Sequence, residues 1–291
     1  MYKAFYGLSL NPFTVLPDPE FILPTRQHRM AMIMLESALM NGAPFFVLTG
    51  EIGTGKSTLV QNLLSSEERG ITFGVINNGQ ASIGELLQWV LLAFKLPFTG
   101  KGKVEMYEIL VDFVRQEFAQ YRRVVLVIDE AHNLDLATLE ELRMLSNINV
   151  GKQQMLQMIL VGQSQLKDKL RQPELEQFAQ RVVFDFHLTA LSLDDSKTYI
   201  MHRLRVAGAE KLTIFTDAAC ESIHLYSGGI PRLINMICDM AMVYGFAEEQ
   251  KVIGSKLVQA VAQDRQANGV IPLNYQHLDD DKQTVVTKLK S

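Results

Sequence analysis

The stretch Gly50-Glu51-Ile52-Gly53-Thr54-Gly55-Lys56-Ser57 is the most informative part of this 291-residue sequence. It fits the pattern G-x-x-x-x-G-K-[ST]. The short apolar run at residues 44–49 stands directly before it and predicts a buried strand, and a helical pattern follows it. A strand, a glycine-rich loop and a helix in this order predict a phosphate-binding loop, because inward-pointing backbone N–H groups and a helix N-terminus both favour an anion.

The residue types in this loop indicate a nucleotide with a metal ion. A lysine at position 56 is suited to contact β- and γ-phosphates, and the Ser57 hydroxyl is suited to hold Mg²⁺. We therefore predict ATP and Mg²⁺ as the cofactors. The predicted nucleotide-binding residues of this segment are Gly50, Glu51, Ile52, Gly53, Thr54, Gly55, Lys56, Ser57 and Thr58.

A second signal is an acidic pair at the end of a predicted strand. Residues 124–128 form an uninterrupted β-branched and leucine run, which Asp129 and Glu130 follow directly. An unpaired buried charge costs several kcal/mol, so two adjacent acids here indicate chemistry rather than packing. We expect Asp129 to support the Mg²⁺ and Glu130 to polarise the attacking water. His132 is interpreted as a structural or sensing neighbour rather than a catalytic group.

The remaining pattern predicts an α/β fold with a separate helical part. Buried strands are expected at residues 44–49, 71–76, 124–128, 156–161 and 182–186, with helices at 27–40, 59–64, 83–94, 106–118 and 136–145. Strands separated by helices predict a mostly parallel five-stranded sheet that is flanked by helices on both faces. From residue 193 onward only helical patterns occur, at 196–207, 217–226, 230–246 and 255–263.

These patterns give a three-part division of the chain. We predict an α/β nucleotide-binding domain over residues 1–190 that includes an N-terminal arm over 1–25. A small all-α lid is expected over 191–266. Residues 267–291 lack apolar periodicity and are expected to be a polar tail of low order.

Composition narrows the class of protein. The net charge of −4 argues against a generally basic nucleic-acid binder. The two cysteines, Cys220 and Cys238, match no metal or redox spacing. No window approaches the apolar length of a membrane span, and the N-terminal 25 residues lack the apolar core of a signal peptide. We therefore predict a cytoplasmic location and no membrane span.

Beyond these motifs, the sequence resembles the AAA+ superfamily of P-loop NTPases, and more narrowly the ATPases of the general-secretion-pathway protein A type. That group includes relatives linked to pilus and exopolysaccharide export. The resemblance covers residues 1–263 and implies a helical lid after the nucleotide-binding domain. It is carried by Tyr6-Gly7-Leu8, Asn11-Pro12-Phe13, Pro17-Asp18-Pro19, the phosphate loop, residues 128–132, Leu160-Val161-Gly162-Gln163, Gln180-Arg181, Tyr199-Ile200, His202-Arg203-Leu204 and residues 228–232.

The resemblance implies roles for four further residues. His28 would lie near the adenine, and Gln163 would sense the γ-phosphate. Arg181 corresponds to an arginine finger that a neighbouring subunit inserts, and Arg232 would reach the nucleotide from the lid. The alternatives are a simple strand-end glutamine at 163, an ordinary solvated arginine at 181 and a purely structural arginine at 232.

The resemblance also implies partners. It predicts a homo-oligomer, a ring or a filament, that hydrolyses ATP at subunit interfaces. Such an ATPase would be a motor or switch for an envelope assembly in secretion, pilus biogenesis or polysaccharide export. It would act peripherally at the inner membrane through an envelope or membrane-associated protein.

Two other functions remain open at this point. One is a DNA-associated regulator of the transposition target-selector type, for which Lys101, Lys103, Arg122 and Arg123 would supply a basic strip. The other is a nucleotide-binding scaffold that does not hydrolyse. It is disfavoured by the joint presence of Lys56, Ser57, Asp129, Glu130 and Arg181.

Overall fold

The computed structural model describes residues 2–14, 21, 23–65, 70–77, 85–150, 153–210, 212–269 and 273. Pro17-Asp18-Pro19, the predicted helix start at 83–84 and most of the predicted tail lie outside these residues. Contacts divide the chain into two compact units. The first, called the α/β unit below, contains Arg26–Ile52 and Lys56–Thr189. The second, the helical unit, contains Met1–Thr25, Gly53–Gly55 and Ala190–Ser291.

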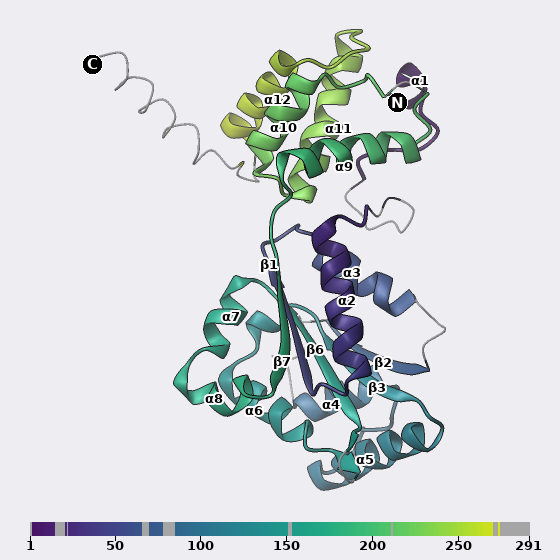
Figure 1. The fold of residues 1–291 in the computed structure, drawn as a ribbon, viewed down its shortest axis with the longest axis vertical. Coiled ribbons are helices and arrows are strands. Elements are labelled where there is room, and N and C mark those ends of the chain that lie inside the picture. The colour runs from purple at the N-terminus through teal and green to yellow at the C-terminus, as the bar shows by residue number, and fades with distance from the viewer. Residues whose placement is uncertain are drawn as a thin grey trace, which may run out of the picture. The chain divides into compact units, whose positions relative to one another are not determined.

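A five-stranded parallel sheet forms the centre of the α/β unit (Figure 1). Its strands are β1 (Phe45–Gly50), β2 (Ile71–Ile76), β3 (Arg123–Ile128), β6 (Leu156–Gly162) and β7 (Val182–Leu188). Their spatial order is β2-β3-β6-β1-β7. The predicted α/β fold class is confirmed. Strands β1 and β6 are buried along their whole length because both faces of a parallel sheet are covered.

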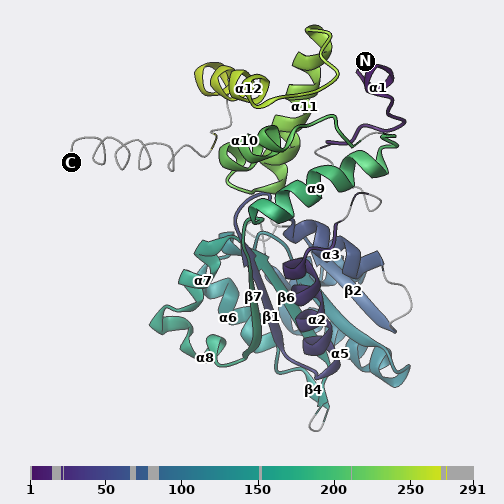
Figure 2. The same cartoon turned by 45° about the horizontal axis from the view of Figure 1, so that its top comes forward.

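Successive strand residues point to opposite faces, and each face has its own core. On one face, Phe46, Leu48, Val125 and Val127 pack with α2 (Arg26–Met40) and α3 (Lys56–Ser65), which lie together in Figure 2. On the other face, alternate residues of the same strands pack against a second set of helices. That set is α4 (Leu86–Ala93), α5 (Lys103–Ala119), α6 (Leu136–Leu145), α7 (Ser164–Leu170) and α8 (Glu176–Ala179).

Strand register brings three predicted site segments to one edge of the sheet. Thr49 of β1 pairs with Gly162 of β6, and Ile128 of β3 pairs with Leu160 of β6. The carboxyl ends of β1, β6 and β3 therefore lie side by side, with β6 in the middle. The sequence did not indicate this order, nor did it indicate α7, α8 or the short hairpin of β4 (Asn149–Val150) and β5 (Gln153–Gln154).

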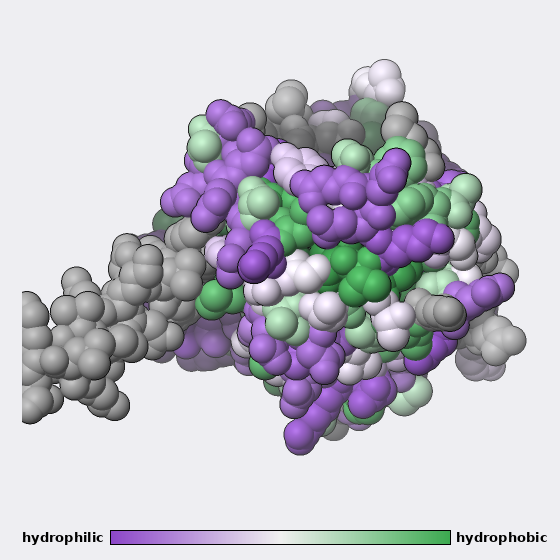
Figure 3. Space-filling model, turned by 90° about the horizontal axis from the view of Figure 1, so that it is seen from above, coloured by the Kyte–Doolittle hydropathy of each residue, from purple (hydrophilic) through white to green (hydrophobic). Residues whose placement is uncertain are grey.

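The helical unit contains α9 (Leu193–Val206), α10 (Asp217–Ser227), α11 (Pro231–Ala247) and α12 (Ser255–Asn268). The side chains of Ser192 and Thr216 cap the first two helices by accepting backbone N–H groups. Both cysteines are buried here, and burial raises the pKa of each thiol, to about 11 for Cys220. Figure 3 shows a face of the molecule on which hydrophobic side chains gather among hydrophilic ones.

The N-terminal arm differs from the expected domain assignment. We expected residues 1–25 to belong with the α/β domain, but their contacts group them with the helical unit. Tyr2, Leu8 and Phe13 are buried in the core of that unit. The arm also includes the short helix α1 (Lys3–Tyr6), and Ser9 N donates a 2.9 Å hydrogen bond to Ala207 O. The physical reason is that the apolar side chains of the arm complete the helical core.

A buried arginine fastens the arm. Arg203 of α9 donates to the carbonyl oxygens of Pro12 and Thr14, and its guanidinium lies 4.6 Å from the ring centroid of Phe21. A buried guanidinium has five N–H donors and needs acceptors. The carbonyl groups of the arm supply them, so this motif residue has a structural role in the helical unit.

Candidate nucleotide-binding site

The phosphate loop has the predicted setting between a strand and a helix. Strand β1 ends at Gly50, and α3 begins at Lys56. Gly53 and Gly55 have φ values of +84° and +104°, a left-handed region that favours glycine. Thr54 is buried, Ile52 is exposed, and Ser57 and Thr58 occupy the first turn of α3. The loop conformation thus requires the glycines that the motif contains.

Lys56 is held inside the loop. Its Nζ donates to Gly50 O at 2.8 Å and to Glu51 O at 2.9 Å. Burial lowers the pKa of Lys56, and the carboxylates of Glu130, Asp129 and Glu51 oppose that shift. The ammonium is therefore poorly solvated and surrounded by oxygen atoms, an arrangement that an added phosphate would complete.

The acidic pair lies where the sequence predicts it, at the end of β3. Ser57 Oγ donates to Asp129 Oδ2 at 3.4 Å, which connects the phosphate loop with this strand end. Asp129 Oδ1 accepts the backbone N–H of Glu130 at 2.8 Å. Glu130 has a φ of +52°, which is uncommon for a residue with a side chain and is frequent at functional sites. Its carboxylate is about half exposed.

The hydroxyl and carboxylate oxygens fit a magnesium ion. Mg²⁺ prefers oxygen ligands and is commonly held by one or two protein groups together with substrate phosphates. Over the described part of the chain, no group of three or more His, Cys, Asp or Glu side chains could hold a metal by itself. The Ser57 hydroxyl and the Asp129 carboxylate are two oxygen groups close to each other, so they suit an ion that shares its ligands with a nucleotide.

Gln163 also lies at this edge, as the residue before α7. Its Nε2 is 3.0 Å from Nε2 of His132, and its backbone N is 3.4 Å from Nδ1 of the same ring. His132 Nδ1 is in turn 3.4 Å from Glu130 Oε2. Next to Gln163, Ser164 Oγ donates to Glu51 Oε1 at 2.6 Å. The structure thus brings Gln163 and the acidic pair together through His132.

Arg181 is not part of this group. It precedes β7, whose first residue Val182 pairs with Phe45 at the start of β1. The phosphate loop follows the other end of β1, which is six residues long and therefore spans about 20 Å. Arg181 Nη1 donates to Ser146 Oγ at 2.6 Å. Its guanidinium lies at the opposite edge of the sheet from Lys56.

His28 and Arg232 come from two further helices, α2 and α11. His28 is a half-buried residue in the first turn of α2. Arg232 is in the first turn of α11 in the helical unit, and its N–H donates to the carbonyl of Gly53, which belongs to the same unit, at 3.3 Å. A Cβ on Gly53 would lie 2.7 Å from Arg232 Cβ, so this approach requires a glycine. The roles of His28 and Arg232 toward a nucleotide stay predictions.

Sequence reasoning missed Lys169. Its Nζ donates to His132 O at 2.8 Å and to Leu134 O at 2.5 Å, which fixes the turn after the acidic pair. One signal could have indicated α7 and with it Lys169: Leu166 and Leu170 are four positions apart, a spacing that fits one face of a helix.

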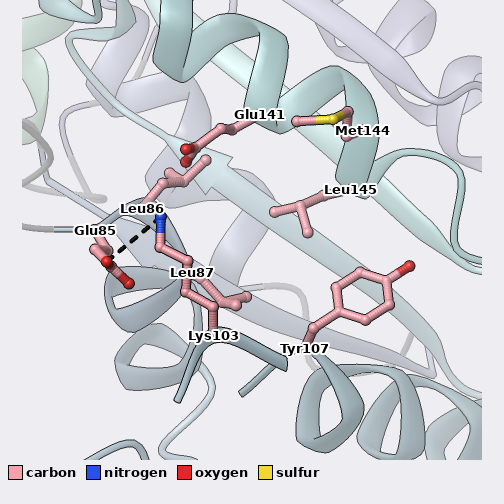
Figure 4. A pocket seen from close by; sticks show the side chains of 8 residues that line it. All are labelled: Glu85, Leu86, Leu87, Lys103, Tyr107, Glu141, Met144 and Leu145. Atoms are coloured by element: carbon pink, nitrogen blue, oxygen red, sulfur yellow. Dashed lines mark ion pairs between the residues drawn. The ribbon is translucent and has the colours of Figure 1, made fainter. Parts of the chain in front are cut away.

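A separate cavity lies between α4, α5 and α6 (Figure 4). Its volume is about 340 Å³, and an ion pair of 3.4 Å between Glu85 and Lys103 closes one side. None of the predicted site residues lines it, so the phosphate loop and this cavity are different places. Its lining residues are Glu85, Leu86, Leu87, Lys103, Tyr107, Glu141, Met144 and Leu145.

Comparison with known proteins agrees with the geometry of the loop and the strand end. Residues 39–170 match the AAA domain family. General secretion pathway protein A of Aeromonas hydrophila is 38% identical over 248 residues, which are 85% of this chain and 45% of that protein. This chain therefore spans less than half the length of that relative.

Solved structures share the fold at low sequence identity. The Cdc6p structure from Pyrobaculum aerophilum has a TM-score of 0.64 and 18% identity, covering 86% of this chain and 71% of that one. The ADP form of Aeropyrum pernix ORC2 has a TM-score of 0.61 and 17% identity, covering 88% and 72%. Together with the parallel sheet and the phosphate loop, these matches show that the chain has the P-loop NTPase fold, that residues 39–170 form an AAA domain, and that the chain is similar to general secretion pathway protein A.

Proposed function

We propose that this chain binds ATP with Mg²⁺ and hydrolyses the nucleotide. The observation that carries the proposal is that Lys56, Ser57, Asp129 and Glu130 meet at one edge of the sheet. Each of these groups has a place in phosphoryl transfer, which depends on positioning and on neutralising charge. A loop that only made a turn would not need a buried lysine beside two carboxylates.

The residues divide the work by their chemistry. Lys56 binds the β- and γ-phosphates, with the backbone N–H groups of the loop beside it. Ser57 and Asp129 hold the cation, which when bound neutralises charge on the phosphates. Glu130, half exposed at the strand end, orients a water molecule and accepts its proton. Gln163 contacts the γ-phosphate and so senses whether it is present. His28 lies beside the adenine.

The position of Arg181 supports an oligomer. Because it lies about 20 Å from the loop of its own subunit, it acts only on a nucleotide of a neighbouring copy. We propose that subunits form a ring or filament in which Arg181 stabilises the charge that develops on the transferred phosphoryl group. Arg232 links the helical unit to the state of the nucleotide.

The relationship to general secretion pathway protein A supports a role in an envelope assembly. We propose a motor or switch on the cytoplasmic side of the inner membrane that acts through an envelope or membrane-associated protein. Among the described residues, no helix is both long and apolar enough to cross a bilayer.

The DNA-associated alternative has less support from the surface charges. Three of the four residues of the supposed basic strip are in ion pairs: Lys101 with Glu105, Lys103 with Glu85, and Arg122 with Glu117. Cations that are already paired contribute less to the release of counterions from DNA.

The decisive experiment is the ATPase rate per subunit against protein concentration, for wild type and Arg181→Ala, with and without duplex DNA. We expect a rate that rises with concentration, requires Arg181 and does not respond to DNA. A rate independent of concentration would refute hydrolysis at subunit interfaces. A rise that requires DNA would favour the DNA-associated regulator. Crosslinking in cells should then recover an envelope protein, and its repeated absence would refute the envelope role.

A further inference from the structure

The ring of His132 lies between two predicted functional groups. One ring nitrogen, Nδ1, is 3.4 Å from Glu130 Oε2, and the other, Nε2, is 3.0 Å from the side-chain nitrogen of Gln163. We propose that His132 is a positioning residue that holds Glu130 and Gln163 in one geometry, so that the group that senses the γ-phosphate sets the position of the base. This inference rests on the proposed ATPase function.

The hydrogen-bonding capacity of a neutral imidazole suits this task. It has one N–H donor and one acceptor nitrogen. With the hydrogen on Nδ1, the ring donates to the carboxylate of Glu130, and Nε2 accepts from the side-chain amide of Gln163. With the hydrogen on Nε2, Nδ1 instead accepts the backbone N–H of Gln163, which lies 3.4 Å from it. The first tautomer is the one that connects Glu130 with Gln163. The ring side chain is only 12% exposed, whereas the Glu130 side chain is 49% exposed. The buried ring is thus the fixed element, and the exposed carboxylate is the element that it orients.

Contacts from α7 and from the end of β6 fix the position of the His132 ring. Lys169 binds the carbonyl oxygens of His132 and Leu134, which holds the short 3₁₀ turn Ala131–Asn133. A Cβ on Gly162 would lie 3.2 Å from the backbone N of His132 and 2.9 Å from a methyl group of Leu166. The end of β6 therefore lies directly against this turn, and any movement of Gln163 is passed to the ring.

This arrangement predicts a particular kinetic defect. Neither His132 nor Lys169 is placed to bind phosphate, so their loss leaves nucleotide affinity unchanged. Without the ring, the carboxylate of Glu130 would lose its contact with Nδ1 of His132. The Glu130 backbone is left-handed, and the carboxylate would leave the orientation required to activate water. A displacement of about 1 Å at a reacting group can cost as much as 10²-fold in rate, so the defect belongs in kcat.

The test uses two substitutions with opposite properties. His132→Phe keeps the size and planarity of the ring and removes both hydrogen bonds. His132→Gln changes the shape but keeps one donor and one acceptor. For His132→Phe we expect kcat to fall about 10-fold to 100-fold, with KM and the affinity for a non-hydrolysable ATP analogue within about 3-fold of wild type. His132→Gln should recover most of kcat.

A double-mutant cycle with Gln163→Leu tests whether the ring acts through its two partners. If it does, His132→Phe costs much less in the Gln163→Leu background than in wild type. Thermal unfolding of each variant shows that it is folded.

Equal kcat for His132→Phe and wild type, or a loss that His132→Gln shares in full, would overturn the positioning role. An additive double mutant would do so as well. Failure of the proposed function has a different signature, because wild type itself would then show no ATPase activity at any protein concentration.

Discussion

Ser57 Oγ lies 3.4 Å from Oδ2 of Asp129, although 72 positions separate the two residues in the sequence. The contact joins the loop after β1 to the end of β3, with β6 between the two strands. The Ser57 hydroxyl and the Asp129 carboxylate place oxygen atoms close to each other, so we expect both to bind the same Mg²⁺ ion.

Replacing either oxygen donor should impair hydrolysis more than nucleotide binding. For Ser57→Ala and Asp129→Asn we expect kcat to fall at least about 10²-fold, because the cation no longer neutralises the transferred phosphoryl group. Fluorescent ADP binding in the presence of EDTA should remain close to wild type. Ser65→Ala is the matched control, since its hydroxyl lies at the other end of α3 and donates to Asn62 O. Full activity of both site variants would contradict the assignment.

Lys56→Met should weaken ATP binding and leave the thermal stability of the protein nearly unchanged. Loss of a charge-assisted contact to phosphate should weaken ATP binding by about 10-fold to 100-fold. The ammonium is buried, a state that lowers its pKa, so an apolar side chain of similar length should leave the thermal midpoint within a few degrees of wild type. Calorimetric titration and thermal unfolding measure the two quantities. A variant that binds ATP normally would show that the loop lysine does not contact phosphate.

Two inactive variants should restore activity when mixed. Arg181→Ala lacks the group supplied to the neighbour, and Glu130→Gln lacks the base in its own site. In a mixed oligomer, an interface can pair an intact Glu130 from one copy with an intact Arg181 from the other. We expect up to about a quarter of wild-type activity in an equal mixture, as random pairing allows. Activity no greater than the sum of the separate variants would place Arg181 outside the reaction.

The local pattern was sufficient to predict the main elements and the phosphate loop. Residues 136–145 and 71–76 match α6 and β2, because the leucine spacing of the first fits a helix and the second is a short apolar run. Strand order was not predictable, since continuous apolar runs carry no information on which strand is the neighbour. The same limit hid the contact of His132 with Gln163, which depends on β6 lying beside β3. The placement of the arm depends on long-range packing that no local pattern encodes.

The pair of Glu117 and Arg122 should make stability depend on pH. Hydrogen bonds from Arg122, and then from Thr72, lower the pKa of Glu117, while burial opposes this. A lowered folded-state pKa gives stability that is complete above the unfolded pKa and is lost as pH falls through the folded one. Glu117→Gln should therefore lower the free energy of unfolding by about 1–2 kcal/mol at neutral pH, a range that allows for solvent around the half-exposed Arg122. Urea unfolding should show the difference from wild type shrinking toward about pH 3. A difference that grew with acid would have the wrong sign.

Arg203 should determine how firmly the arm is bound. Arg203→Met leaves the carbonyls of Pro12 and Thr14 without this donor, and we expect a loss of about 1–3 kcal/mol in unfolding free energy. Trypsin should then cleave after Lys3 faster than in wild type, which intact mass measures. Arg205→Met, two residues along in the same helix and exposed, is the matched control and should behave as wild type. Equal cleavage rates in all three proteins would mean that the arm is held without Arg203.

The assignment of the arm to the helical unit has a consequence for synthesis. Tyr2 leaves the ribosome 237 positions before Asp239, the residue to which its hydroxyl donates. The whole α/β unit is translated in between, so the nascent chain carries Leu8 and Phe13 unburied until α9, α10 and α11 have emerged. Exposed apolar segments of this kind favour aggregation during folding. The arm is thus made well before most of the core that buries it, and it is a segment for which a growing chain needs a chaperone.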